Sequence, residues 1–171
     1  MKNLKIACSC ALTFAIWQGA APLFAESNAA KSPAAATVAY PDGYRAYTHV
    51  KSLLLKPNHP LANPFAGLHH VYANPRALSG LKSGKYEDGS VLVFDLLEPQ
   101  EGGDATAEGK RKLVGVMQRD SKKFAATGGW GFEGFAGNSR SERLVKDGGV
   151  SCYGCHQART QQSFVFSEWR E

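Results

Sequence analysis

The 171-residue chain carries 20 lysines and arginines against 15 aspartates and glutamates, so its formal net charge is +5. These charges are interspersed and form no basic block, which argues against nucleic acid or an anionic membrane surface as a partner. The length fits one domain of ordinary size, and 43% hydrophobic residues are enough to build a buried core.

The first 25 residues have the layout of a secretory signal peptide. Lys2 and Lys5 give a positive start, an apolar run follows from Ile6 to about Trp17, and small residues lead up to Ala25. The apolar run is too short and too interrupted for a membrane anchor. We therefore expect cleavage after Ala25 and export to the periplasm.

The exported chain divides into two predicted parts. Residues 26–39 are rich in alanine and serine and are predicted to be a disordered leader, and residues 40–171 form the folded domain. The elements predicted in chain order are a helical turn at 44–47, strands at 48–55 and 65–73, a helix at 76–82, a strand at 90–97, a polar loop at 98–109, a strand at 111–118, a helical turn at 120–126, a strand at 130–136, a short helix ending at 160 and an extended piece at 164–166.

The helix at 76–82 has the clearest boundary signals. Asn74 is a good N-cap, Pro75 suits the first helical position, and Gly84 suits the C-terminus. The 18 glycines fit turns and bends better than a helical bundle. We therefore predict an α+β fold that is mainly an antiparallel β-sheet with a few short helices.

Two of the four cysteines remain after the predicted cleavage, because Cys8 and Cys10 lie within the signal peptide. Cys152 and Cys155 belong to a Cys-Tyr-Gly-Cys-His sequence that ends at His156, which is the attachment pattern of haem c. The two thiols would form thioether bonds with the haem vinyl groups, and the adjacent imidazole would bind the iron. We predict one covalent haem c in a single haem domain.

Two other uses of a Cys-x-x-Cys pair fit the sequence less well. A redox dithiol is expected near a thioredoxin-like βαβ unit, and none is predicted before the motif. A zinc site needs a second cysteine or histidine pair at ligand spacing, and no other cysteine survives the predicted cleavage. Haem attachment requires only export and the adjacent histidine.

The sequence offers few candidates for a second axial ligand to the iron. Met117 lies in a predicted buried strand, where a core role is expected. His69 and His70 adjoin on a strand and so face opposite ways; one could line the haem, but hydrogen-bonded structural roles are expected. His49 and His59 suit ordinary surface or core positions. We therefore expect five-coordinate iron.

Five segments, in order, resemble the cytochrome P-460 superfamily. They are residues 47–52, 67–75, 88–93 and 128–133, and the cysteine motif at 152–156. The similarity runs from about Tyr40 to the C-terminus. It implies a β-sheet haem fold that is usually a homodimer.

The resemblance distinguishes two branches at one residue. Hydroxylamine-oxidising cytochromes P-460 carry a lysine, cross-linked to the haem, in the strand after the Asp-Gly turn, and this sequence has Phe94 there. It is therefore most similar to the β-sheet cytochromes c′ (cytochrome c′-beta), such as that of a methane-oxidising bacterium. In that branch two phenylalanines cap the distal face of the haem, and the resemblance assigns these roles to Phe65 and Phe94.

An apolar distal pocket selects among gases. Bound O₂ is helped by a hydrogen-bond donor, whereas NO and CO depend on one much less, and distal polarity decides between such outcomes. The resemblance therefore implies that the haem binds NO and CO, for NO buffering, detoxification or transport. No catalytic residue is assigned, and a periplasmic redox partner is conceivable.

Two alternatives stay open at this point. One is an enzyme that oxidises hydroxylamine or NO at a cross-linked haem, with Lys82 or Lys85 replacing the missing lysine. The other is a simple electron-transfer cytochrome c, with six-coordinate iron bound by Met117 or a histidine.

The charged residues that precede the cysteine motif can be interpreted in two ways. Arg140, Arg143 and Lys146 are candidates to pair with haem propionates, although solvated loop charges are expected by default. Asp147 lies near the position where hydroxylamine-oxidising relatives carry an acidic residue.

Overall fold

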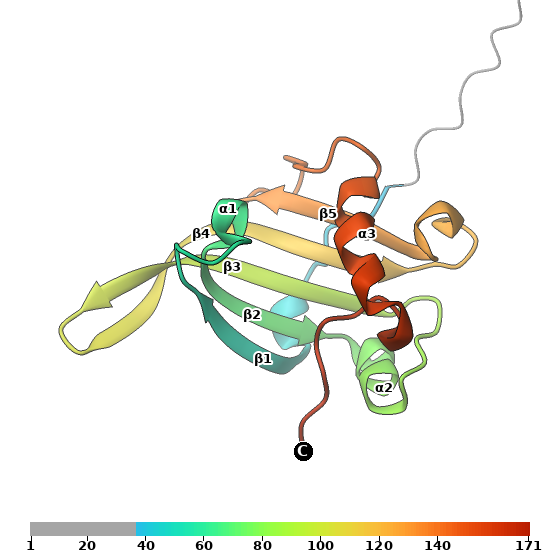
Figure 1. The fold of residues 1–171 in the computed structure, drawn as a ribbon, viewed down its shortest axis with the longest axis horizontal. Coiled ribbons are helices and arrows are strands. Elements are labelled where there is room, and N and C mark those ends of the chain that lie inside the picture. Colours follow the sequence, from blue (N-terminus) through green and yellow to red (C-terminus); the bar gives the residue numbers. More distant parts are fainter. Residues whose placement is uncertain (1–36) are drawn as a thin grey trace, which may run out of the picture. The chain divides into compact units, whose positions relative to one another are not determined.

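Each strand pairs with its neighbours in the chain, so the sheet is an antiparallel meander with the order β1-β2-β3-β4-β5 (Figure 1). The computed structural model describes residues 37–171, and the predicted signal peptide and most of the predicted leader lie outside the described residues. The predicted α+β fold, mainly antiparallel with short helices, is confirmed.

The strands are β1 (Thr48–Leu55), β2 (Gly67–Ala73), β3 (Val91–Gly102), β4 (Ala105–Arg119) and β5 (Trp130–Ala136). The helices are η1 (Tyr44–Ala46), α1 (Ala62–Phe65), α2 (Pro75–Ser83), η2 (Ala125–Thr127), α3 (Val150–His156) and η3 (Gln157–Gln162).

Elements with strong local signals form where they were predicted. Strands β1 and β5 have the predicted bounds. Helix α2 begins after Asn74, whose Oδ1 accepts a hydrogen bond from the N–H of Ala77 at 2.8 Å. It ends at Gly84, whose φ of 76° is a left-handed conformation that glycine adopts without strain.

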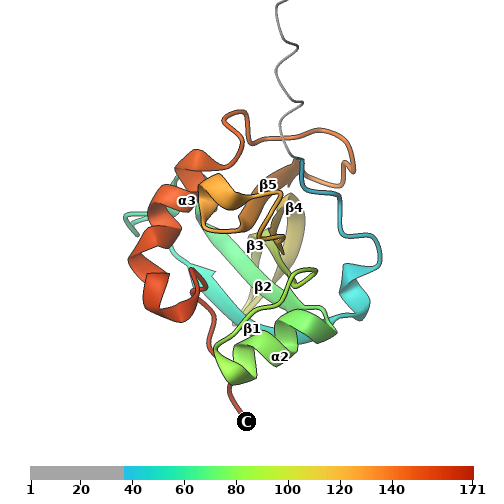
Figure 2. The same cartoon turned by 90° about the vertical axis from the view of Figure 1, so that its right-hand side faces the viewer.

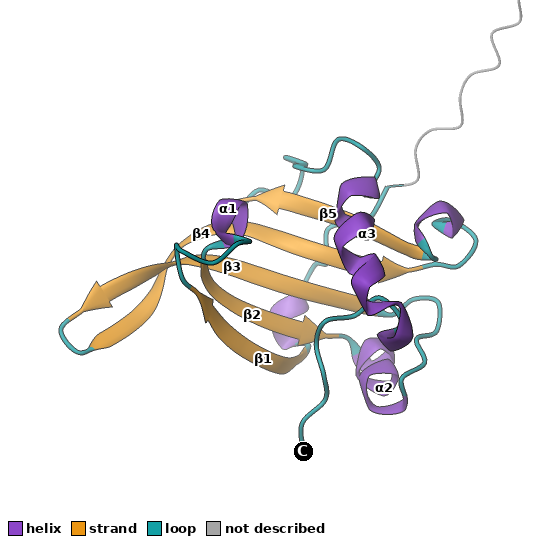
Figure 3. Cartoon of the chain, viewed as in Figure 1, coloured by secondary structure: helices purple, strands orange, loops and turns teal. Residues whose placement is uncertain are grey.

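The predicted loop at 98–109 is wrong, because most of it forms a β-hairpin. Strand β3 continues to Gly102 and β4 starts at Ala105, and the hairpin projects beyond the other strands (Figure 3). The Thr106 hydroxyl donates to a Glu101 carboxylate oxygen at 2.7 Å across the two strands. Nearly every hairpin side chain is exposed, so there is no hydrophobic alternation from which a strand could be recognised.

Phe65 was predicted to begin a strand, and this is also wrong. It is the last residue of α1, and β2 starts at Gly67. Gly67 lies so close to β3 that a Cβ atom there would be 2.3 Å from the Leu97 carbonyl oxygen. Strand β2 therefore begins at a glycine, where the backbones can approach closely, and Phe65 lies before the strand in α1.

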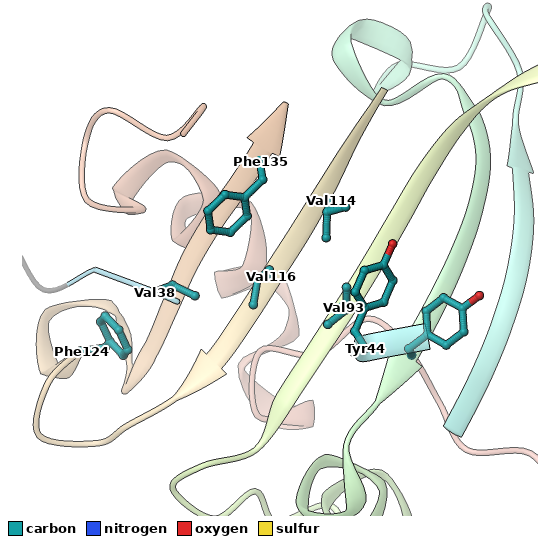
Figure 4. Packing of buried hydrophobic residues seen from close by; sticks show 8 residues of the cluster. Val38, Tyr44, Val93, Val114, Val116, Phe124 and Phe135 are labelled. Carbon is teal, nitrogen blue, oxygen red and sulfur yellow. The ribbon is translucent and has the colours of Figure 1, made fainter. Parts of the chain in front are cut away.

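One face of the sheet packs against η1 and the start of the described chain (Figure 4). Val38 is only 2% exposed, so the packed part of the chain begins before Tyr40. The buried residues of this cluster are Val38, Tyr44, Tyr72, Val93, Val114, Val116, Phe124 and Phe135.

A buried carboxylate, Asp95, holds η1 to this face of the sheet. Its oxygens accept hydrogen bonds from Arg111 Nε at 2.6 Å and from the Tyr44 hydroxyl at 2.7 Å, and Arg45 lies 3.2 Å away. Burial alone would raise the pKa of Asp95, but the hydrogen bonds from Arg111 and Tyr44 hold it below its ordinary value.

The opposite face carries α3, and Figure 2 shows α3 and η1 on opposite sides of the sheet. The buried residues of its cluster are Ala73, Ala77, Leu92, Trp130, Phe132 and Val165. Cys152 and Tyr153 of α3 pack against this cluster. No helix within residues 37–171 is long and apolar enough to cross a membrane.

Candidate functional site

The short helix α3 carries the two cysteines and the histidine of the motif. Both cysteines are free thiols, and their spacing of three places them on neighbouring positions of one helical surface. Burial raises the pKa of the Cys152 thiol, opposite to the lowered pKa of a reactive redox dithiol. The helix therefore presents two thiols and an imidazole together.

Asp147 fixes the start of this helix. One carboxylate oxygen accepts from the N–H of Gly149 at 3.0 Å, and the other accepts from the N–H of Ser151 at 2.9 Å. The hydrogen bonds from Ser151 lower the pKa of Asp147 below its ordinary value. The role seen for Asp147 is thus to cap the helix that bears the motif.

His156 is held in one orientation by a backbone carbonyl and two aromatic rings. Its Nδ1 lies 2.7 Å from the Phe164 carbonyl oxygen, and its ring centroid lies 4.9 Å from that of Phe132 and 5.0 Å from that of Phe166. A carbonyl only accepts, so Nδ1 carries the proton. Burial lowers the pKa of His156, which keeps the ring neutral and leaves the Nε2 lone pair available to a metal.

The Phe164 carbonyl reaches His156 because the chain reverses after η3. Ser163 and Phe164 have φ values of 54° and 68°, which are left-handed and unfavourable for residues other than glycine. The Phe164 N–H donates to the Arg159 carbonyl at 2.7 Å, and the Ser163 hydroxyl donates to the Gly84 carbonyl at 3.0 Å. The predicted extended piece at 164–166 therefore begins with a tight reversal.

The sheet beneath α3 can be described by its cross-strand rows. One row holds Leu92, Met117 and Phe132, and the next row holds Phe94, Gly115 and Gly134. Strands lie about 4.8 Å apart and rise about 3.4 Å per residue, so the Cα atoms of Phe132 and Phe94 are about 12 Å apart on one face. The structure thus brings the motif histidine and Phe94 to the same side of the sheet. Met117 packs in the core cluster, as expected.

Phe94 lies on the central strand, with its ring over Gly115. A Cβ atom at Gly115 would be 2.2 Å from Phe94 Cδ1, so the ring occupies the space that a side chain there would need. Phe94 is partly exposed, although its neighbours Val93 and Asp95 are 0% exposed. At its centre, this face of the sheet is therefore not fully covered by protein.

Phe65 and His69 complete an aromatic group around Phe94. The Phe65 ring meets Phe94 edge-on, with centroids 5.9 Å apart, and the His69 ring stacks on Phe94 at 5.1 Å and 25°. The two predicted distal residues are thus in contact. Sequence reasoning gave His69 no specific role, because its contacts depend on the register of β2 with β3 and on the path of α1. The one available signal was the β-strand alternation that separates His69 from His70.

His49, His70 and several of the cations considered for the site have partners within the protein. His70 lies on the opposite face from His69, 2.7 Å from the Ser52 hydroxyl and 2.7 Å from Glu108. The further ion pairs and contacts are His49 with Ser52, Arg140 with Asp42, Arg143 with Glu133, Lys146 with the Arg143 carbonyl and Lys82 with the Trp169 ring. Both expected structural histidines are therefore hydrogen-bonded.

These residues fit a covalently held haem by the chemistry of their donor set. Two adjacent thiols, a neutral imidazole with its Nε2 lone pair available and a partly exposed apolar face are the groups that haem c attachment requires. The family model for cytochrome P460 matches residues 41–167, which includes the motif, α1 and the whole sheet. A comparison with curated proteins finds no match.

Proposed function

We propose that this chain, which belongs to the cytochrome P460 family, binds NO and CO at one covalently attached, five-coordinate haem c. Membership of the family makes the chain a haem-binding cytochrome with iron as its metal. The finer assignment is ours: Cys152 and Cys155 form the thioether bonds, and His156 is the axial ligand. When bound, the haem iron supplies the coordination position at which a diatomic gas attaches.

The observation that carries the proposal is the contact of Phe65 with Phe94 at the centre of the sheet face that bears α3. Phenyl rings offer a gas no hydrogen bond and the iron no ligand atom. The Nε2–H of His69, whose ring stacks on Phe94, is already bonded to the Phe65 carbonyl oxygen at 2.6 Å. Such a pocket favours NO and CO over O₂, which gains from a distal donor.

The proximal side supports the same proposal. The bond from His156 Nδ1 to the Phe164 carbonyl fixes the tautomer and the direction of Nε2, which is the usual outer-shell arrangement for a histidine that binds a metal. A carbonyl partner, in place of a carboxylate, leaves the imidazole neutral and its bond to iron moderate in strength. We infer that the ferrous iron stays high-spin and five-coordinate until a gas arrives.

We also propose the cellular setting that the sequence indicates. The predicted signal peptide implies a periplasmic protein, and the role there would be to buffer, detoxify or carry NO. A homodimer and a periplasmic redox partner belong to the same proposal. Size-exclusion chromatography with light scattering and fractionation of the native host test the assembly and the location.

The proposal is tested by titrating the purified ferrous protein with NO, CO and O₂. We expect a high-spin ferrous spectrum, saturable binding of NO and CO, and no stable O₂ complex, since the two phenylalanine rings offer bound O₂ no hydrogen bond. A stable O₂ complex contradicts the proposal, as do low-spin ferric signals in electron paramagnetic resonance. Cys152→Ala and Cys155→Ala are the controls for covalent attachment. In each variant the haem should stay attached through one thioether bond, which the intact mass of the protein reports.

The same measurements separate this proposal from a hydroxylamine-oxidising enzyme. A protein–haem cross-link in addition to the thioethers would shift the ferrous Soret band far to the red and appear in tryptic peptides that carry haem. Lys51 is the lysine to examine, because it pairs with Val71, which in turn pairs with Phe94. A red-shifted band that is lost in Lys51→Arg would favour the enzyme.

A further inference from the structure

His69 contacts both phenylalanines of the proposed distal wall. Its ring stacks on Phe94 with a centroid separation of 5.1 Å and an interplanar angle of 25°. Its Nε2 lies 2.6 Å from the carbonyl oxygen of Phe65. One side chain on β2 therefore joins a ring on β3 to the backbone of α1.

The segment that carries Phe65 has little else to hold it. None of the four residues of α1 is buried, and Leu61, which precedes the helix, is 53% exposed. Burial of apolar side chains is the usual anchor of a helix, and a helix this short is not stable alone. Apart from the contact of its ring with Phe94, the position of Phe65 therefore depends on polar contacts.

Two side chains make those contacts. Lys112 Nζ donates to the carbonyl oxygens of Pro64 at 3.1 Å and Ala66 at 2.7 Å, from the middle of β4. His69 donates to the carbonyl between them, that of Phe65 itself. Of these two side chains, only His69 also touches the Phe94 ring, so it adds a second link between Phe65 and Phe94 to the direct contact of their rings.

The protonation of His69 suits this role. Because a carbonyl oxygen only accepts, Nε2 carries the hydrogen. Burial lowers the pKa of His69, and the nearby Lys112, His70 and Lys51 lower it further because they disfavour a positive charge on the ring. The ring therefore stays neutral, with a fixed Nε2–H tautomer, across the neutral pH range.

We propose that His69 is a positioning residue that sets the gap between Phe65 and Phe94 and thereby limits the size of ligand that reaches the iron. The inference rests on the proposed gas-binding function and adds to it the residue that determines size selectivity. With His69 in place, diatomic gases pass and a five-membered ring such as imidazole does not. Without its hydrogen bond, α1 moves away from β3 and imidazole gains access.

The test uses two substitutions that separate the ring of His69 from its hydrogen bond. His69→Phe keeps an aromatic ring against Phe94 and removes the donor, whereas His69→Gln keeps an N–H near the Phe65 carbonyl and removes the ring. His70→Gln is the matched control, since His70 is the next residue of β2 and faces the other side of the sheet. Each is made in the full haem-loaded protein.

The first measurement, amide hydrogen exchange by mass spectrometry, does not depend on gas binding. The N–H groups of Phe65 and Ala66 bond to the carbonyls of Leu61 and Ala62 within α1. We expect His69→Phe to speed their exchange by about tenfold, the effect of losing one hydrogen bond of ordinary strength. His69→Gln should restore most of the protection, and His70→Gln should match the wild type.

The second measurement compares two affinities in each variant: that of the ferric protein for imidazole and that of the ferrous protein for CO. We expect His69→Phe to bind imidazole at least about tenfold more tightly than the wild type, with a smaller change for CO, because loss of the hydrogen bond opens the pocket to the larger ligand. Equal shifts for both ligands, or none, refute a role in size selection.

Failure of this inference can be told from failure of the proposed function. A wild type that binds neither NO nor CO overturns the proposed function, while the exchange data still decide whether His69 holds α1. Unchanged exchange in His69→Phe overturns the positioning role even if gas binding is as proposed. If His69→Phe does not fold, the wild type suffices: nitrogen NMR of the ferrous CO form must show His69 protonated at Nε2, and the other tautomer refutes the inference.

Discussion

Gly115 and Gly134 are neighbours in one cross-strand row, yet we predict opposite responses to alanine. At Gly115 the new Cβ would lie 2.2 Å from Cδ1 and 2.4 Å from Cε1 of Phe94, well inside the closest contact that carbon atoms tolerate. At Gly134 its nearest neighbour would be the Leu144 Cβ at 3.4 Å, an ordinary contact. Neither glycine has a positive φ, so backbone strain does not separate the two positions.

The magnitudes follow from this geometry. Phe94 must leave its position in Gly115→Ala, and forced repacking of this kind costs about 1–3 kcal/mol. The ring is partly exposed and can rotate away from β4, which places the cost in the lower half of that range. Gly134→Ala should be neutral or should stabilise the protein by up to about 1 kcal/mol, because alanine restricts the unfolded chain more than glycine does.

The assay is urea unfolding of both variants, with CO association rates measured on the same preparations. We expect a lower midpoint and a changed CO rate for Gly115→Ala alone, since the Phe94 ring of the proposed distal wall must leave its position there. Equal effects of the two substitutions on stability would refute the reasoning. So would a Gly115→Ala variant with wild-type stability and an unchanged CO rate, because Phe94 could then not lie over Gly115.

Three further outcomes are expected. Asn74→Ala should lower the free energy of unfolding by about 1–2 kcal/mol in urea unfolding, because its side-chain oxygen accepts from the N–H groups of both Ala77 and Val91. Asp95→Asn should cost about 3 kcal/mol and lower the melting temperature by roughly 10 °C in calorimetry, because it leaves Arg111 without its buried partner. Asp95 should also make the stability depend on pH, because its pKa is lower in the folded than in the unfolded protein. Its stabilising effect is complete above about pH 5 and is lost as the pH falls through the folded pKa. Urea midpoints measured between pH 3 and 6 should therefore rise with pH, with a smaller slope in Asp95→Asn.

The parts of the fold that the sequence predicts well are those with local causes. The cap at Asn74, the proline after it and Gly84 lie within one helix and its ends, so α2 needs no distant contact to be recognised. The same holds for the cysteine motif, whose residues share one helical surface. Strand β5 can be recognised from its aromatic residues Trp130, Phe132 and Phe135, although it is buried on both faces and shows no polar alternation.

The parts that were missed depend on pairing between distant segments. The hairpin at 98–109 forms because β3 and β4 are already in register, while its own side chains are exposed and show no alternation. Phe65 leaves the strand because Gly67 must approach the Leu97 carbonyl, a contact across 30 residues. The double contact of His69 requires the register of β2 with β3 and the path of α1, so no local pattern could reveal it.

The proximal and distal sides of the candidate haem site differ in how many chain segments form them. This difference decides which substitutions can change ligand access without disturbing haem attachment. The proximal side, from Asp147 to Phe164, is one continuous segment whose cap, thiols, imidazole and carbonyl hold one another. The distal side is assembled from α1, β2, β3 and β4, with Phe94 at the centre. A substitution at Phe94 therefore alters what reaches the iron while the segment that would hold the haem stays intact. That separation would let a single substitution at position 94 change the ligand selectivity of the haem that we propose without loss of its attachment.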